Sequence, residues 1–126
     1  MNPFTQSLTR TLADPALDAF VARWDALEAL VVRVYRGGAA APADETEWAT
    51  LRPALAEAYP AWAPMLAPHW PQTRAGGQPV SADPFVRLMS FARAADIVGD
   101  WAAMQTLPAA REALNRMLVA RLQARP

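Results

Sequence analysis

The chain has 126 residues, of which 53% are hydrophobic, and its twelve arginines are balanced by twelve acidic side chains. This length fits one hydrophobic core, so we expect a single helical domain over 1–126. The zero net charge argues against nucleic-acid partners. Cysteine is absent, which excludes disulfides, zinc–cysteine sites and thiol catalysis.

Every basic residue besides the single histidine is arginine, a bias typical of GC-rich coding. Without lysine, Schiff-base chemistry, pyridoxal-phosphate attachment and a phosphate-loop lysine are excluded. The charges are unevenly distributed: residues 1–83 hold six arginines and nine acids, and residues 84–126 hold six arginines and three acids. This division predicts either acidic helices packed on basic helices within the chain or head-to-tail self-association.

The sequence also predicts the cellular location of the protein. The segment Met1–Arg10 is polar and lacks the apolar stretch of a signal peptide. The longest aliphatic run, Ala29–Val32, is far shorter than a membrane span. Together with the absence of cysteine, these features predict a cytoplasmic protein with no membrane partner.

The first predicted helix covers 14–37. Asp14 is a suitable N-cap, Pro15 fits the first turn, and Gly37-Gly38 ends the helix. Apolar residues recur at helical spacing between these signals: Leu17, Phe20, Val21, Trp24, Leu27, Leu30, Val31 and Val34.

A second helix is predicted over 44–59, opened by a capping-box pattern at Asp44 and Glu47 and kinked by Pro53. Seven prolines lie between residues 53 and 84, both included. We therefore expect residues 60–82 to form a long connection, with a short helical turn or two followed by an extended loop, rather than a long regular helix. Its tryptophans, Trp62 and Trp70, favour a connection that packs on one end of the domain.

Two more helices are predicted, over 83–99 and 106–125. Asp83-Pro84 repeats the first start signal, and Thr106 is the expected cap of the last helix. Strand-forming residues are scarce, with Ile97 the only isoleucine. The predicted fold is all-α, an antiparallel bundle of three long helices plus short helices.

Two acidic residues fall where a plain bundle would place leucine. On helical wheels, Glu28 and Asp96 lie in the middle of apolar stripes, where a carboxylate costs free energy unless it is paired. Arg121, at the border of the last helix's apolar face, is a candidate partner for either, and Arg93 and His69 are others. The alternatives are a structural ion pair and a buried carboxylate pair that binds a ligand or metal or works as acid and base.

His69, between Pro68 and Trp70, is the only histidine, and no Glu-x-x-His pair is present. We therefore predict no cofactor and no metal site, and treat His69 as a loop histidine with a possible binding role. Trp62 and Trp70 either pin the proline-rich connection to the core or form a binding face.

These observations lead to three functional hypotheses. The first is a non-enzymatic helical domain for protein–protein interaction or scaffolding, which self-associates. The second is a small-molecule- or metal-binding bundle, or an enzyme, that uses Glu28 and Asp96. The third is single-strand nucleic-acid binding through Trp62, Trp70 and Arg74, against which the zero net charge weighs.

Overall fold

The computed structural model describes residues 14–70, 72–75, 78–81 and 83–124. The elements are α2 (Pro15–Gly37), α3 (Pro42–Leu66), the 3-10 helix η1 (Ala67–His69), β1 (Gln72–Ala75), β2 (Gln78–Ser81), α4 (Pro84–Met89), the 3-10 helix η2 (Ala94–Ile97) and α5 (Trp101–Ala124). The all-α prediction is confirmed, with three long helices and a small two-stranded hairpin. The hairpin is antiparallel, pairing Gln72 with Ser81 and Ala75 with Gln78.

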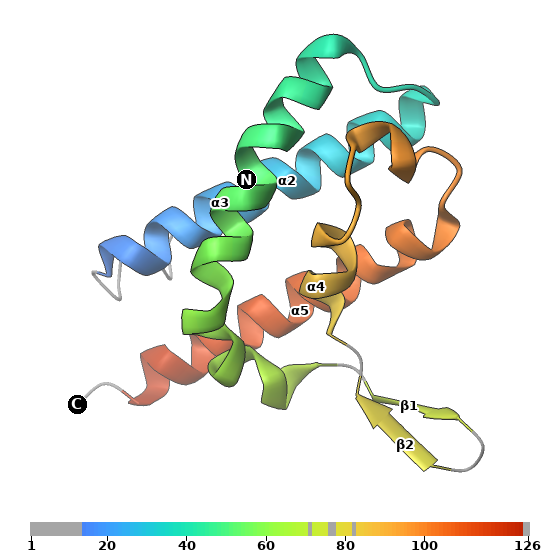
Figure 1. Cartoon of the computed structure of the whole chain (residues 1–126). Helices are drawn as coiled ribbons and strands as arrows, with labels where there is room; N and C mark the ends of the chain where they lie inside the picture. Colours follow the sequence, from blue (N-terminus) through green and yellow to red (C-terminus); the bar gives the residue numbers. More distant parts are fainter. Residues whose placement is uncertain (1–13, 71, 76–77, 82, 125–126) are drawn as a thin grey trace.

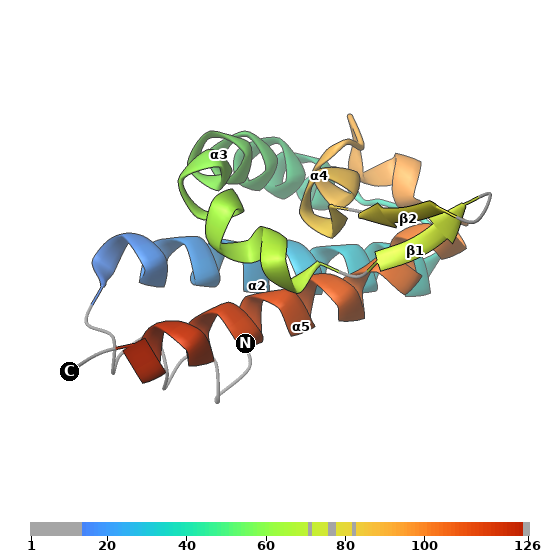
Figure 2. The ribbon, with the colours of Figure 1, turned by 90° about the horizontal axis from the view of Figure 1, so that it is seen from below.

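The long helices form two layers. Helices α2 and α5 run in opposite directions in one layer, and α3 crosses them in the other beside α4 (Figures 1 and 2). The hairpin extends away from the helices on the α4 side (Figure 1). The core lies between the layers, where the rings of Trp24 and Phe85 are 4.7 Å apart and those of Tyr59 and Phe85 are 5.4 Å apart.

Helix α2 begins and ends at the predicted signals. The carboxylate of Asp14 accepts a hydrogen bond from the Leu17 backbone N–H at 3.1 Å. Gly38 ends the helix with φ +72°, a left-handed conformation that glycine adopts without a steric penalty. Its backbone N–H donates to the carbonyls of Val34 and Tyr35.

Helix α3 is longer than the predicted 44–59 and takes up the start of the expected connection. It begins at Pro42, where Asp44 accepts from the Ala41 backbone N–H at 2.9 Å, and continues to Leu66. Its three internal prolines, Pro53, Pro60 and Pro64, are all exposed. Because they share the solvent side, the carbonyls that lose their helical donors lie where water can replace them. The expected break at residue 60 was therefore wrong, although α3 changes direction along its length (Figure 1).

The buried face of α3 explains why the helix persists through these prolines. Its buried side chains recur at helical spacing: Trp48, Leu55, Tyr59, Trp62 and Leu66. Burying large apolar side chains offsets the loss of single hydrogen bonds. Of the predicted connection 60–82, only the part after Leu66 is non-α; residues 71, 76–77 and 82 lie outside the described residues.

The predicted long helix over 83–99 was also wrong. Helix α4 stops at Met89, and residues 94–97 form the 3-10 turn η2. Side chains from α3 bind the backbone that would otherwise continue the helix. Trp48 donates its indole N–H to the Phe91 carbonyl at 3.0 Å. Glu45 accepts the backbone N–H groups of Ala94 and Ala95 at 2.8 and 3.0 Å.

Helix α5 begins five residues before the predicted Thr106. Asp100 opens it instead, accepting the Ala103 backbone N–H at 3.1 Å. Thr106 lies inside the helix and donates its hydroxyl to the Ala102 carbonyl at 2.7 Å. Pro108 is exposed within the helix, and residue 125, the predicted helix end, lies outside the described residues.

Candidate functional site

Asp25, the most buried charged residue in the described ranges, belongs to a cluster of charges between α2 and α5. Arg111 binds Asp25 and Glu28, with its Nε 3.1 Å from the Glu28 carboxylate and its Nη2 hydrogen-bonded to Asp25. The exposed fractions of these side chains are 16% for Arg111, 4% for Asp25 and 24% for Glu28. One guanidinium thus serves two carboxylates, and the cluster carries a formal charge of −1.

The fold brings this cluster together because α2 and α5 are antiparallel. Asp25 and Glu28 are three residues apart and lie on one side of α2. Arg111 belongs to the middle of α5. Burial acts to lower the pKa of Arg111, but the hydrogen bonds with Asp25 and Glu28 outweigh it and raise the pKa, so the guanidinium stays charged.

The same helix pair carries a second ion pair. Arg121, near the end of α5, binds the N-cap residue Asp14 at 3.1 Å. Arg111 and Arg121 both come from the basic half of the chain, and their carboxylate partners come from the acidic half. Of the two predicted consequences of the uneven charge distribution, these contacts represent the first, in which acidic helices pack on basic helices within the chain.

A cleft of about 520 Å³ opens beside the cluster. Its lining residues are Asp25, Glu28, Ala29, Val32, Arg33, Arg36 and Arg111. Its apolar part consists of Ala29 and Val32, and its basic rim of Arg33 and Arg36. The volume lies in the range of about 300–1,000 Å³ that is typical of ligand pockets.

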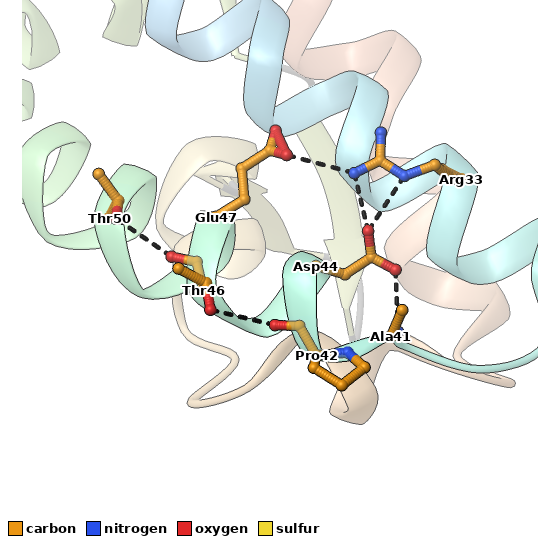
Figure 3. Close-up of polar contacts among 7 residues, drawn as sticks. All are labelled: Arg33, Ala41, Pro42, Asp44, Thr46, Glu47 and Thr50. Atoms are coloured by element: carbon orange, nitrogen blue, oxygen red, sulfur yellow. Dashed lines mark hydrogen bonds and ion pairs between the residues drawn. The ribbon is translucent and has the colours of Figure 1, made fainter.

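Arg33 is held in place at the rim by the start of α3 (Figure 3). Its guanidinium donates to Asp44 at 2.9 and 3.1 Å and to Glu47 at 3.2 Å. The hydrogen bond from the Ala41 N–H, followed by that from Arg33, lowers the pKa of Asp44. Bonding to Asp44 in turn raises the pKa of Arg33.

A large exposed aromatic residue lies next to the cleft. Trp101, the first residue of α5, has an exposed fraction of 61%. Its ring is 6.3 Å from that of Tyr35, in the last turn of α2. Tyr35 is three residues after Val32, which lines the cleft, and residues three apart are neighbours on the surface of a helix, so Trp101 and the cleft are adjacent.

The two predicted acidic residues are not brought together. Glu28 lines the cleft, but Asp96 lies in η2, where it accepts the Arg93 backbone N–H at 3.1 Å. The Asp96 side chain is 40% exposed and forms an ion pair with Arg93 at 3.5 Å. The helical wheel misplaced Asp96 because residues 94–97 form a 3-10 turn. A shared buried site of Glu28 and Asp96 is therefore incorrect.

The predicted partner Arg121 meets neither acid. Besides its ion pair with Asp14, it lies 5.7 Å from the centre of the Trp62 ring and donates to the sulfur of Met65 at 3.3 Å. Trp62 is only 8% exposed. This arrangement ties together α2, α3 and α5, and it leaves Trp62 covered rather than open for stacking on a base.

His69 and Trp70 follow α3 and lie away from the cleft. Trp70 is partly buried against the core. His69 lines a separate hollow of about 450 Å³ with α5 residues that include Asn115 and Arg116. Within the described ranges, no three acidic or histidine side chains gather to hold a metal ion. Arg74 belongs to β1, and the structure gives no description of its side chain.

The sequence reasoning missed Asp25, Arg111 and Tyr35. Asp25 could have been found from its position three residues before Glu28, at the edge of the same apolar stripe. Arg111 could not, because its pairing depends on how α5 packs on α2.

Comparison of the chain with protein-family models, with curated proteins and with solved structures found no match. Over the described residues, no helix combines the length and the apolar character needed to cross a membrane.

Proposed function

We propose that this protein is a non-enzymatic interaction domain that binds protein, first of all a second copy of itself, through the face carrying Trp101 and the cleft. The observation that carries this proposal is the exposure of Trp101, at 61%. Leaving an indole in water forgoes the free energy of its burial. Tryptophan and arginine are the residues that most often anchor protein interfaces.

The surroundings of Trp101 support an interface. Tyr35 stands against one side of its ring, and the cleft with Arg33 and Arg36 lies next to Tyr35. An apolar and aromatic centre with an arginine rim is the usual composition of such a surface. The carboxylates of Asp25 and Glu28 already accept hydrogen bonds from Arg111, which suits a fixed structural role better than proton transfer. As part of this proposal we place the protein in the cytoplasm, in keeping with its lack of cysteine.

The test is sedimentation velocity over a concentration series. We expect the wild-type sedimentation coefficient to rise through the micromolar range, and Trp101→Ser to weaken association by about 30-fold, as for a hot-spot residue. Val86→Ser is the matched control, because Val86 is 51% exposed on α4 and lies outside the proposed face. A wild-type protein that stays monomeric at high micromolar concentration would overturn the proposal.

A further inference from the structure

The exposed indole and the cleft are neighbours on one face. The Trp101 ring contacts Tyr35, while Val32, one helical turn before Tyr35, and the adjacent Arg36 line the cleft. One turn of helix is about 5.4 Å, so a projecting side chain and a hollow able to receive one lie side by side.

The cleft has the size and the chemistry to receive an indole. Its volume, about 520 Å³, exceeds that of a tryptophan side chain, and its apolar part is formed by Ala29 and Val32. Guanidinium groups pack favourably on the face of an indole ring. The Arg33 guanidinium is already fixed by Asp44 and Glu47, so binding an indole would order little more of it.

Charge complementarity indicates which molecule supplies the indole that binds in the cleft. Asp100 directly precedes Trp101, and the Ala103 N–H binds only its Oδ1. Arg36 at the cleft rim forms no ion pair within the described residues. An indole that enters the cleft of another molecule from an identical α5 carries Asp100 toward that molecule's Arg36.

We infer that the partner is a second copy of this chain, related by a two-fold axis, with Trp101 of each copy seated in the cleft of the other. This inference rests on the proposed self-association and specifies its geometry. Because the indole and the cleft lie on one face, the two contacts form reciprocally and the assembly closes as a dimer. A head-to-tail contact would require them on opposite faces and would continue into a filament.

Two variants test the contributions of the indole and of the cleft separately. Trp101→Ala removes the indole and keeps the cleft, and Ala29→Arg fills the cleft and keeps the indole. Ala29 is exposed on α2, so the longer side chain costs little in folding, which circular dichroism verifies. We expect each variant alone to lose dimerisation by at least 30-fold. An equimolar mixture should regain association, because the Trp101 of one variant can enter the open cleft of the other.

Sedimentation of the two variants, alone and mixed, decides the inference, with Val86→Arg on α4 as a control that should dimerise like the wild type. If Ala29→Arg dimerises normally while Trp101→Ala does not, the protein self-associates through Trp101, but the indole does not bind in the cleft. If the mixture stays monomeric although each variant is folded, the indole does not enter the cleft of the other copy and the reciprocal arrangement is wrong. A monomeric wild type overturns the proposed function and this inference together.

Discussion

The hydroxyl of Tyr59 lies 2.7 and 2.8 Å from the two carboxylate oxygens of Asp83, although 24 residues separate them in the chain. The same carboxylate caps α4, accepting the backbone N–H groups of Phe85 and Val86 at 2.9 and 3.2 Å. One buried side chain of α3 therefore fixes the start of α4, across the connection that contains the hairpin.

Removing this hydroxyl should lower the free energy of unfolding. We expect Tyr59→Phe to cost about 1.5–3 kcal/mol, the usual contribution of a hydrogen bond to a charged group. Urea unfolding followed by circular dichroism measures the change. Tyr35→Phe is the control and should change stability by less than about 0.5 kcal/mol, because the Tyr35 hydroxyl forms no hydrogen bond with the described residues. Equal costs for the two variants would contradict the role of the Asp83 bond.

Tyr59 should also make the protein sensitive to alkali. Burial, and then the hydrogen bond to Asp83, raise the pKa of Tyr59 above its ordinary value. A group whose pKa is raised by folding contributes stability that is present below its unfolded pKa, about 10 for tyrosine, and lost as pH rises above it. We expect the Tyr35→Phe variant to show tyrosinate absorbance only as it unfolds. Tyrosinate formation near pH 10 with an intact circular dichroism spectrum would refute this.

Arg111 should be the arginine whose loss costs most. Arg111→Met leaves the Asp25 carboxylate, 4% exposed, without its cationic partner. Removing one member of a buried ion pair costs about 3–5 kcal/mol. Arg116→Met, on the same helix and 62% exposed, should cost less than about 0.5 kcal/mol.

A double variant tests whether the uncompensated charge of Asp25 causes the loss of stability in Arg111→Met. Adding Asp25→Asn to Arg111→Met removes the uncompensated charge and should recover part of the lost stability. A double variant that is no more stable than Arg111→Met would mean that packing, rather than the buried charge, sets the cost.

The sequence predicted the helical class and the bounds of α2, because capping residues and an apolar stripe lie within the same segment. It did not predict the course of α3. The proline rule predicts a helix end before residue 60, yet Pro53, Pro60 and Pro64 follow one another at spacings of seven and four and share the exposed side. The sequence does contain this signal, since the apolar residues from Trp48 to Leu66 keep the helical period through the prolines.

The rest of the site depends on packing between distant elements. Residues 90–99 resemble a helix in sequence, but the Glu45 carboxylate and the Trp48 indole of α3 occupy their backbone groups. A wheel drawn through Asp96 therefore placed it wrongly. The pairing of Arg111 with Asp25 spans 86 residues and follows from the antiparallel packing of α2 and α5, which local patterns do not encode.

The hydrogen bonds that Glu45 accepts from η2 give another prediction. Glu45→Ala leaves the backbone N–H groups of Ala94 and Ala95 without their acceptors, and should cost about 1–3 kcal/mol. Hydrogen exchange at these two amides should accelerate more than exchange in α2. Glu57→Ala, at an exposed position of the same helix, is the control and should leave both measurements unchanged. Slow exchange at Ala94 and Ala95 in Glu45→Ala would show that other contacts hold η2.

The internal prolines of α3 should be replaceable with a gain in stability. In Pro60→Ala the new backbone N–H can donate to the Ala56 carbonyl, and the ring no longer crowds that carbonyl. Removing an internal proline gains about 3 kcal/mol, and the looser unfolded chain offsets about 0.4–1 kcal/mol of this gain, so we expect a net stabilisation of about 2 kcal/mol, seen as a higher Tm. Pro15→Ala is the matched control, because a proline in the first turn of a helix lacks a donor that would be unpaired anyway. A lower Tm for Pro60→Ala than for the wild type would mean that α3 does not run continuously through residue 60.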